Sequence, residues 1–339
     1  MPIDNTSMTF QDLELDDALC HAVADMGFSK PTSIQSLVIP EAMDSRDILA
    51  SAPTGTGKTA AFLLPACQFL LDYPRQEPGA TRVLILTPTR ELAIQVYEQA
   101  RAITAKTDLV CGVITGGINY GTDKETLSQN LDILVATPGR LFEHIEKETA
   151  DCRDIECLIL DEADRMLDMG FQAALEAIVA ATPTTRQTLL FSATYGDSVR
   201  PVAERMLREP VKVEVASTHN EQSIRQHFHR VADEPARLAA LCQLLLHYRP
   251  ESSVVFCNTR RETQAVADEL MSAGVSAEAL HGDLEQRDRD QTLIRFANKS
   301  LSVLVATDVA ARGLDIDALD AVFNYQIARE LEVHVHRIG

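Results

Sequence analysis

The chain has 339 residues, of which 45% are hydrophobic and 24% charged, which predicts a globular protein with room for two domains. The net charge of −19 excludes coating of nucleic acid by bulk electrostatics, because that mode needs clustered Lys and Arg. No apolar run reaches the about 20 residues that span a bilayer. The seven cysteines form no CxxC pair, which disfavours a disulfide framework and a zinc site. We therefore expect a cytoplasmic protein that makes no membrane contact.

Short apolar runs alternate with amphipathic stretches along the first two thirds of the chain. In order, the runs that predict strands are RDILAS, RVLILTP, DILVATP, CLILDEAD, TLLFSAT and VKVEVA. The polar segment ASTHNEQSIRQ interrupts them, and the pattern restarts with SVVFCNT, AEALHG, LSVLVATD and AVFNYQ. Strands that are apolar throughout and separated by helices indicate parallel sheets covered on both faces. We predict two doubly wound α/β domains, residues 1–217 and 222–339, joined by a short linker.

A phosphate-binding loop is predicted where ASAPTGTGKTAAF follows the first strand and opens a helix. Glycines let backbone amides surround phosphate oxygens, and the helix N-terminus adds a partial positive charge. Lys58 can reach the terminal phosphates and Thr59 can ligate Mg²⁺. The strict pattern has Gly where this chain has Ala52. The alternative is a simple turn before a core helix.

An acidic pair follows the buried run CLIL. Asp161 comes at the end of this predicted strand and Glu162 follows it directly. A carboxylate in that place can hold Mg²⁺ opposite Thr59, while its neighbour orients the attacking water. Alone, the sequence DEAD would be read as a solvated acidic turn. Together with the phosphate loop it indicates an NTPase.

These motifs resemble the DEAD-box ATP-dependent RNA helicases over nearly the whole chain. In the order of that family the sequence has GFSKPTSIQ, APTGTGKT, PTRELA, TGG, DEAD, SAT, NTRRE, HGDLEQRDR and ATDVAARGLDI, with TPGR between TGG and DEAD. The family pattern has Ala at position 52. The resemblance implies that both domains are RecA-like and that the protein uses ATP and Mg²⁺.

Nucleotide-binding roles follow from this resemblance. Gln35 would contact the N6 and N7 edge of adenine and Phe10 would stack on the base; from the residues alone, Gln35 would be a surface helix residue. The other implied nucleotide contacts are Phe28, Lys30, Ala52, Pro53, Thr54, Gly55, Thr56, Gly57, Lys58, Thr59, Gly313 and Asp315. The implied catalytic set is Lys58, Thr59, Asp161, Glu162, Ser192 and Thr194. The SAT hydroxyls would link the acidic site to RNA, or simply cap a strand end.

The resemblance also implies RNA-contacting loops that read backbone geometry instead of base sequence. In the first domain these are Pro88, Arg90, Gly116, Gly117, Thr137, Pro138, Gly139, Arg140, Gly170 and Phe171. In the second they are Thr259, Arg260, His281, Gly282, Gln286, Thr307 and Arg312, with Arg289 in the same motif as Gln286. Taken alone, Arg90 and Arg140 are as well explained by capping a helix or pairing with a neighbouring carboxylate.

The implied activity is separation of short RNA duplexes, in which ATP and RNA bind between two domains and hydrolysis releases the RNA. Two other classes of function remain open. One is an ATP-gated RNA clamp without useful catalysis, and the other is a DNA translocase, which the Gln35 motif and the DEAD and SAT sequences disfavour.

The last residues, HRIG, match the beginning of the final family motif, in which two arginines then follow. We therefore expect a second domain that is incomplete at its C-terminus and a chain whose ATP turnover is impaired. The first domain resembles the bacterial helicases of ribosome assembly, and the second the bacterial helicases of ribosomal RNA. The expected partners are ribosomal RNA or pre-ribosomal particles, bound by a monomer.

Overall fold

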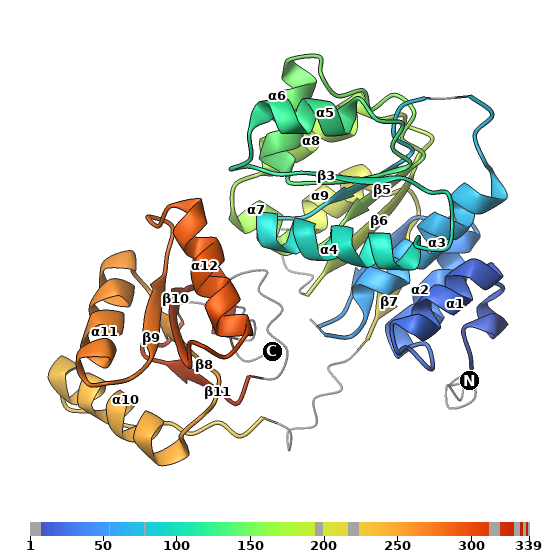
Figure 1. The fold of residues 1–339 in the computed structure, drawn as a ribbon. Coiled ribbons are helices and arrows are strands. Elements are labelled where there is room, and N and C mark those ends of the chain that lie inside the picture. The colour runs from blue at the N-terminus through green and yellow to red at the C-terminus, as the bar shows by residue number, and fades with distance from the viewer. Residues whose placement is uncertain are drawn as a thin grey trace. The chain divides into compact units, whose positions relative to one another are not determined.

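The computed structural model describes residues 8–53, 55–77, 79–193, 199–215, 224–311, 319–328, 333–334 and 337. The chain divides into two compact units, Met1–Ser217 and Thr218–Gly339, each built on its own sheet (Figure 1). Thr54, Thr194, Arg312, Gly313 and Asp315, which were assigned site roles, lie outside the described residues.

Unit 1 contains a seven-stranded sheet in the order β3-β4-β2-β5-β6-β1-β7. All six of its strand pairings are parallel. The strands are β1 (Ile48–Ser51), β2 (Val83–Leu86), β3 (Cys111–Ile114), β4 (Ile133–Ala136), β5 (Cys157–Leu160), β6 (Gln187–Ser192) and β7 (Val211–Glu214). The helices are η1 (Gln11–Leu13), α1 (Asp17–Asp25), α2 (Ser33–Met43), α3 (Lys58–Asp72), α4 (Arg90–Ile103), α5 (Tyr120–Leu127), α6 (Pro138–Glu146), α7 (Ala163–Asp168), α8 (Gln172–Ala181) and α9 (Val199–Met206).

Two hydrophobic clusters cover the two faces of this sheet. Alternate residues of β2 point in opposite directions, so Val83 joins one cluster and Leu84 the other. Helices α1 to α4 contribute to the first cluster and α6 to α9 to the second. Phe62 of α3 packs on Phe191 of β6 with 5.2 Å between ring centroids, which fixes the helix that follows the phosphate loop to the centre of the sheet. Burial on both faces explains why these strands are apolar throughout.

Unit 2 contains a four-stranded parallel sheet in the order β11-β8-β10-β9. Its strands are β8 (Ser253–Cys257), β9 (Ala277–Leu280), β10 (Val303–Thr307) and β11 (Ala321–Asn324). Its helices are α10 (Glu234–Tyr248), α11 (Arg260–Ser272), α12 (Gln286–Ala297) and α13 (Asp308–Ala311). Helices α10 and α11 pack on one face, and α12 and α13 on the other. The predicted fold class is confirmed in both units.

The strand β3 was not among the predicted strands. It is short, lies at the edge of the sheet and contains Gly112. A Cβ atom on Gly112 would lie 2.6 Å from Leu131 Cδ1, so the backbone approaches that side chain more closely than any other residue would permit. A glycine chosen for close packing weakens the apolar pattern by which strands are detected in a sequence.

Asp47, just before β1, joins two segments that are distant in the sequence. Its carboxylate accepts hydrogen bonds from Thr188 N at 2.8 Å and Arg208 N at 2.7 Å, and the residue is buried. It therefore fixes the start of β6 and the turn before β7.

We predict that Asp47→Ala lowers the free energy of unfolding of unit 1 by about 2–3 kcal/mol, because two backbone N–H groups lose their acceptor. Asp47→Asn keeps one acceptor oxygen and should lose about half as much. Urea unfolding followed by circular dichroism measures both. An Asp47→Ala variant as stable as the parent would contradict this account of the segment.

Candidate functional site

The phosphate-loop sequence lies between β1 and α3, and its geometry depends on two glycines. Gly55 has φ 74° and Gly57, the N-cap of α3, has φ 90°. The Thr56 hydroxyl donates to Pro53 O at 2.7 Å, which closes the loop. Lys58 is buried, and its Nζ donates to Ala52 O at 3.0 Å across the loop. The loop thus surrounds a buried ammonium group that donates to a neutral carbonyl.

Gln35 touches this loop directly. Its Oε1 accepts from Thr32 N at 2.9 Å and its Nε2 donates to Gly57 O at 3.1 Å. A Cβ atom on Gly57 would lie 2.5 Å from that Nε2. The amide of Gln35 is therefore used to join the N-terminus of α2 to the phosphate loop, and the interpretation of Gln35 as an ordinary surface residue is wrong.

The two aromatic residues assigned to the base differ in exposure. Phe10 is only 3% exposed and belongs to the hydrophobic core, whereas Phe28 is 37% exposed. Lys30 is exposed close by in the sequence. In this structure the Phe10 ring is covered by protein atoms, so stacking of Phe10 on a base stays a prediction, and Phe28 is the ring that is accessible.

Asp161 directly follows β5 and is almost completely buried. Burial raises the pKa of its carboxyl to about 7, and the nearby Lys58 ammonium opposes that rise. Its Oδ1 atom is buried and has no hydrogen-bond partner among the described residues. This oxygen fits the role of a cation ligand, because it is buried, receives no hydrogen bond from the described residues and is influenced by the charge of Lys58. Together with the Thr59 hydroxyl it provides the hard oxygen ligands that Mg²⁺ prefers.

Glu162 and Asp164 have different partners. Glu162 is buried, has φ 54°, and accepts from Arg165 Nη1 at 2.9 Å. A left-handed backbone at a residue other than glycine costs about 1–2 kcal/mol. Asp164 Oδ2 accepts from Ala193 N at 3.1 Å, which connects the acidic motif to the end of β6. DEAD and SAT are therefore connected by a hydrogen bond between Asp164, which had no role assigned from the sequence, and a backbone amide. The predicted link from the SAT hydroxyls to RNA stays a prediction.

The loops assigned to RNA in unit 1 follow neighbouring strands. Gly116 and Gly117 follow β3, Gly139 follows β4, and Arg90 follows β2. These three strands are adjacent in the sheet, while the phosphate loop, DEAD and SAT follow the adjacent strands β1, β5 and β6. The sheet therefore separates these motifs at the boundary between β2 and β5, except for DMGF, which lies between α7 and α8.

Exposed backbone is what these loops have in common. Gly116, Gly117, Gly139 and Gly170 are all exposed, whereas Pro88, Thr137 and Pro138 are buried. A Cβ atom on Gly139 would lie 3.5 Å from Phe171 Cε1, so TPGR and DMGF lie side by side. Thr137 Oγ1 accepts from Gly116 N at 3.4 Å, which joins the TGG and TPGR loops.

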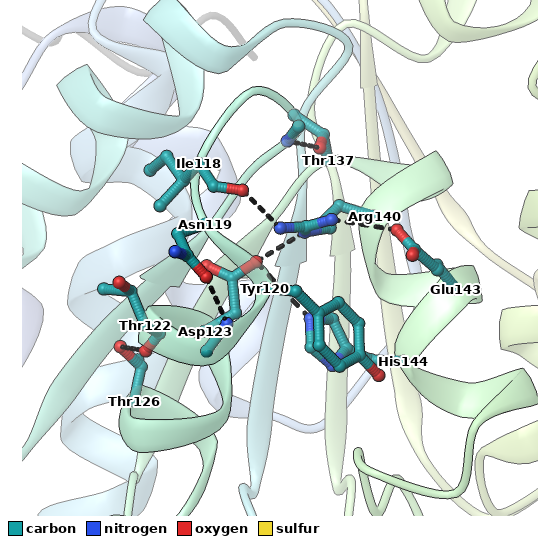
Figure 2. A network of polar contacts seen from close by, with 12 residues as sticks. Ile118, Asn119, Tyr120, Thr122, Asp123, Thr126, Thr137, Arg140, Glu143 and His144 are labelled. Atoms are coloured by element: carbon teal, nitrogen blue, oxygen red, sulfur yellow. Dashed lines mark hydrogen bonds and ion pairs between the residues drawn. The ribbon is translucent and has the colours of Figure 1, made fainter.

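Arg140 is held inside the protein (Figure 2). Its Nε donates to Asp123 Oδ2 at 2.5 Å, its Nη1 to Glu143 Oε2 at 2.9 Å and its Nη2 to Ile118 O at 2.5 Å. The side chain is 11% exposed. The alternative that Arg140 pairs with neighbouring carboxylates is therefore confirmed.

In unit 2 the assigned loops follow β8, β9 and β10, which are also adjacent strands. Thr259 is the exposed N-cap of α11, and the exposed Arg260 pairs with Asp283 while lying 3.6 Å from a Cβ built on Gly282. His281 is buried and bonded to Gln264 Oε1 at 3.1 Å. Thr307 accepts from Ala310 N at 3.3 Å, so its side chain caps α13.

Arg337 is a further residue that was given no role from the sequence. It pairs with Asp308 through Nε at 2.5 Å and Nη2 at 2.8 Å, and donates to Asn258 Oδ1 and Gln326 O at 2.8 and 2.6 Å. The side chain is almost fully buried. It joins the residues that follow β8, β10 and β11, so it stabilises the edge of the unit 2 sheet that contains the assigned RNA loops.

Comparisons with known proteins agree with this arrangement. Residues 32–202 match the DEAD/DEAH box helicase family and residues 236–339 the helicase conserved C-terminal domain. The chain is 48% identical over 336 residues to the ATP-dependent RNA helicase SrmB of Escherichia coli, covering 98% of this chain and 76% of that protein. It belongs to the DEAD-box ATP-dependent RNA helicases.

Other relatives extend this result. The ATP-dependent RNA helicase DbpA of Escherichia coli is 44% identical over 318 residues, with 93% of this chain and 68% of that protein covered. The structure of S. cerevisiae Dbp5 bound to RNA and ADP BeF3 superposes with a TM-score of 0.87 at 28% identity, covering 98% of this chain and 85% of that one. This DEAD-box helicase is thus an RNA-stimulated ATPase that uses ATP and Mg²⁺. No helix within the described ranges combines the length and apolar character needed to cross a bilayer.

The contact between Gln35 and Gly57 gives a test of the helicase nucleotide site. Gly57→Ala should weaken ATP binding at least about tenfold, because the new methyl group meets Gln35 Nε2 and the backbone conformation is unfavourable for alanine. Gly55→Ala is the matched control, since its φ is also positive but its Cβ would meet nothing within 4 Å.

Fluorescent-nucleotide titration measures the affinity of each variant. The clash predicts that Gln35→Ala partly restores binding when combined with Gly57→Ala. Equal losses at positions 55 and 57, without rescue, would show that backbone strain alone is responsible.

Proposed function

We propose that this helicase separates short RNA duplexes locally, and that the sequence-assigned residues perform the steps. Lys58 binds the terminal phosphates, Thr59 and Asp161 hold Mg²⁺, and Glu162 positions the hydrolytic water. When bound, Mg²⁺ neutralises charge on the phosphate oxygens. The observation that carries this assignment is the buried Asp161 Oδ1 without a donor, close to Lys58 and at the end of the strand adjacent to β6.

We propose that RNA is contacted mainly through backbone groups. The exposed glycines at 116, 117, 139 and 170 let an RNA backbone approach peptide groups, which suit phosphate oxygens and 2′-hydroxyls. Two of these N–H groups already have acceptors inside the protein, because Gly116 N donates to Thr137 Oγ1 and Gly170 N to Leu167 O. Several assigned side chains, such as Arg140, His281 and Thr307, are instead engaged in hydrogen bonds of their own unit. Contacts to the phosphates and sugars of RNA carry no information about the bases, which supports sequence-independent binding. The net charge of −19 supports the same mode, because bulk attraction to RNA is absent.

We further propose that ribosomal RNA or a pre-ribosomal particle is the substrate, and that the helicase acts as a monomer in the bacterial cytoplasm. This proposal is supported by the resemblance of the first domain to helicases of ribosome assembly and of the second to helicases of ribosomal RNA. The identities of 48% to SrmB and 44% to DbpA also support this proposal.

Glu162→Gln tests the catalytic assignment. The amide keeps the size of the carboxylate but cannot accept a proton or orient water in the same way, so kcat for ATP should fall at least about a hundredfold. ATP affinity should stay within about twofold, because the amide keeps the size of the side chain and can still accept from Arg165 Nη1.

ATP hydrolysis of the parent and the variant is measured with single-stranded RNA, with DNA of the same sequence and without nucleic acid. RNA should stimulate the parent and DNA should not. A Glu162→Gln variant that hydrolyses ATP at the parent rate would transfer the water-positioning role to another residue. A parent that binds ATP and RNA without RNA-stimulated hydrolysis would favour the clamp function.

The proposed substrate predicts co-migration with ribosomal precursors. The helicase with Glu162→Gln, held in its ATP-bound form, should sediment with precursor particles of the source bacterium on a sucrose gradient, because reduced turnover prolongs the bound state. The parent supplies the comparison, and nuclease treatment is the control for RNA dependence. Distribution of the variant over all RNA species in proportion to their mass would refute a ribosomal substrate.

A further inference from the structure

Helix α5 begins immediately after the exposed glycines of the TGG loop, and a buried polar chain connects it to α6. Asn119 is the N-cap of α5 and accepts from Gly121 N at 2.8 Å. Asp123, in the first turn, is 1% exposed. Its Oδ2 is shared by Arg140 Nε at 2.5 Å and His144 Nε2 at 3.4 Å (Figure 2). Neither Asp123 nor His144 belongs to a motif assigned from the sequence.

The donors and acceptors of this chain have one consistent order. A carboxylate only accepts, so the His144 proton facing Asp123 must be on Nε2. Burial lowers the pKa of His144, whose side chain is fully covered, so the ring is neutral and Nδ1 is an acceptor. Thr149 Oγ1 lies 2.8 Å from Nδ1 and 3.1 Å from His144 O, so its proton is shared between these two acceptors. The Tyr120 hydroxyl, 2.8 Å from Thr149 Oγ1, donates to it in turn.

Packing reinforces these hydrogen bonds. The Tyr120 ring stacks on His144 with 4.2 Å between centroids and 7° between planes. The Arg140 Cζ atom lies 5.3 Å from the same Tyr120 ring. Tyr120 therefore covers both His144 and Arg140 and has its hydroxyl in the same chain of hydrogen bonds.

The chain ends at the backbone of the TGG loop. Arg140 Nη2 donates to Ile118 O at 2.5 Å, and Gly116 N donates to Thr137 Oγ1 at 3.4 Å. Between these two attachments lies Gly117 with φ 80°, a residue with wide conformational freedom. A guanidinium held by Asp123 thus fixes a segment that would otherwise sample many conformations.

We propose that Asp123, His144, Thr149 and Tyr120 are positioning residues for RNA binding, which hold Arg140 and through it the backbone of residues 116–118 in the conformation that contacts RNA. The proposal rests on the proposed function, since it concerns the same RNA-contacting loop. It differs from the direct role expected for Arg140, in which the guanidinium itself contacts a phosphate.

His144→Phe is the sharpest test, because the ring can still stack on Tyr120 while both hydrogen bonds are lost. Thr149→Val removes only a hydroxyl, and Asp123→Ala removes the carboxylate that holds Arg140. Each should weaken binding of single-stranded RNA about tenfold, the loss expected when a buried hydrogen bond that orders the loop is removed. Glu143→Gln is the matched control, since Glu143 also pairs with Arg140 but is 39% exposed, and its effect should stay within about twofold.

Three measurements separate positioning from other roles. Hydrogen exchange of peptides covering residues 115–119 should accelerate in the three variants and remain unchanged over the phosphate loop. ATP affinity without RNA should be unaltered. The slope of log affinity against log salt should remain that of the parent, whereas loss of a direct phosphate contact would reduce it by about 0.7.

Folded His144→Phe and Thr149→Val variants that bind RNA like the parent would overturn the inference, whether or not Asp123→Ala folds. A slope reduced by about 0.7 in Arg140→Gln, which removes the charge, would also overturn it, by restoring the direct contact. A parent chain that does not bind RNA would instead refute the proposed function, and the two failures are thereby distinguished.

Discussion

The parallel direction of every strand pairing is the constraint on which the sites of this helicase depend. Parallel strands need crossover connections, so the residues that follow each strand all reach the same edge of the sheet. The order β3-β4-β2-β5-β6-β1-β7 then decides which motifs become neighbours. Residues assigned to the nucleotide follow β5, β6 and β1, and most residues of unit 1 assigned to RNA follow β3, β4 and β2. DMGF is the exception, because it follows α7 and reaches TPGR through the contact of Phe171 with Gly139.

Burial of charge is the second constraint, and it acts most strongly at Asp161. Desolvation raises the pKa of this carboxyl to about 7, and the ammonium of Lys58 is the main favourable influence. Without a ligand, the Asp161 carboxyl is held in an environment that disfavours its charged form. A cation at Asp161 would remove that penalty.

Ten of the eleven strands within the described residues could be predicted from the sequence because fully buried strands leave continuous apolar runs. The strand β3 could not, since Gly112, where only glycine fits beside Leu131, interrupts its apolar pattern. Among site residues, the motifs located the loops but not the orientation of the side chains within them. Three further residues were not predicted because their contacts are made with residues that only folding brings next to them. These contacts are Asp123 with Arg140, Asp164 with Ala193 N, and Arg337 with Asp308. No local sequence pattern indicates them.

Arg140 shows how the orientation of a side chain within a predicted loop changes its expected part in RNA recognition. A guanidinium that donates to two carboxylates and a carbonyl has little capacity left for a phosphate, but it holds a backbone whose N–H groups can make that contact. Peptide groups carry no net charge, so an RNA site built from them adds little to the counterion release on which basic proteins depend. Ordering of the loops before RNA arrives lowers the entropy cost of binding, which matters more for a chain with a net charge of −19 that gains nothing from bulk attraction. Of the two carboxylates on Arg140, Asp123 is buried, so it holds the guanidinium without facing the polyanion.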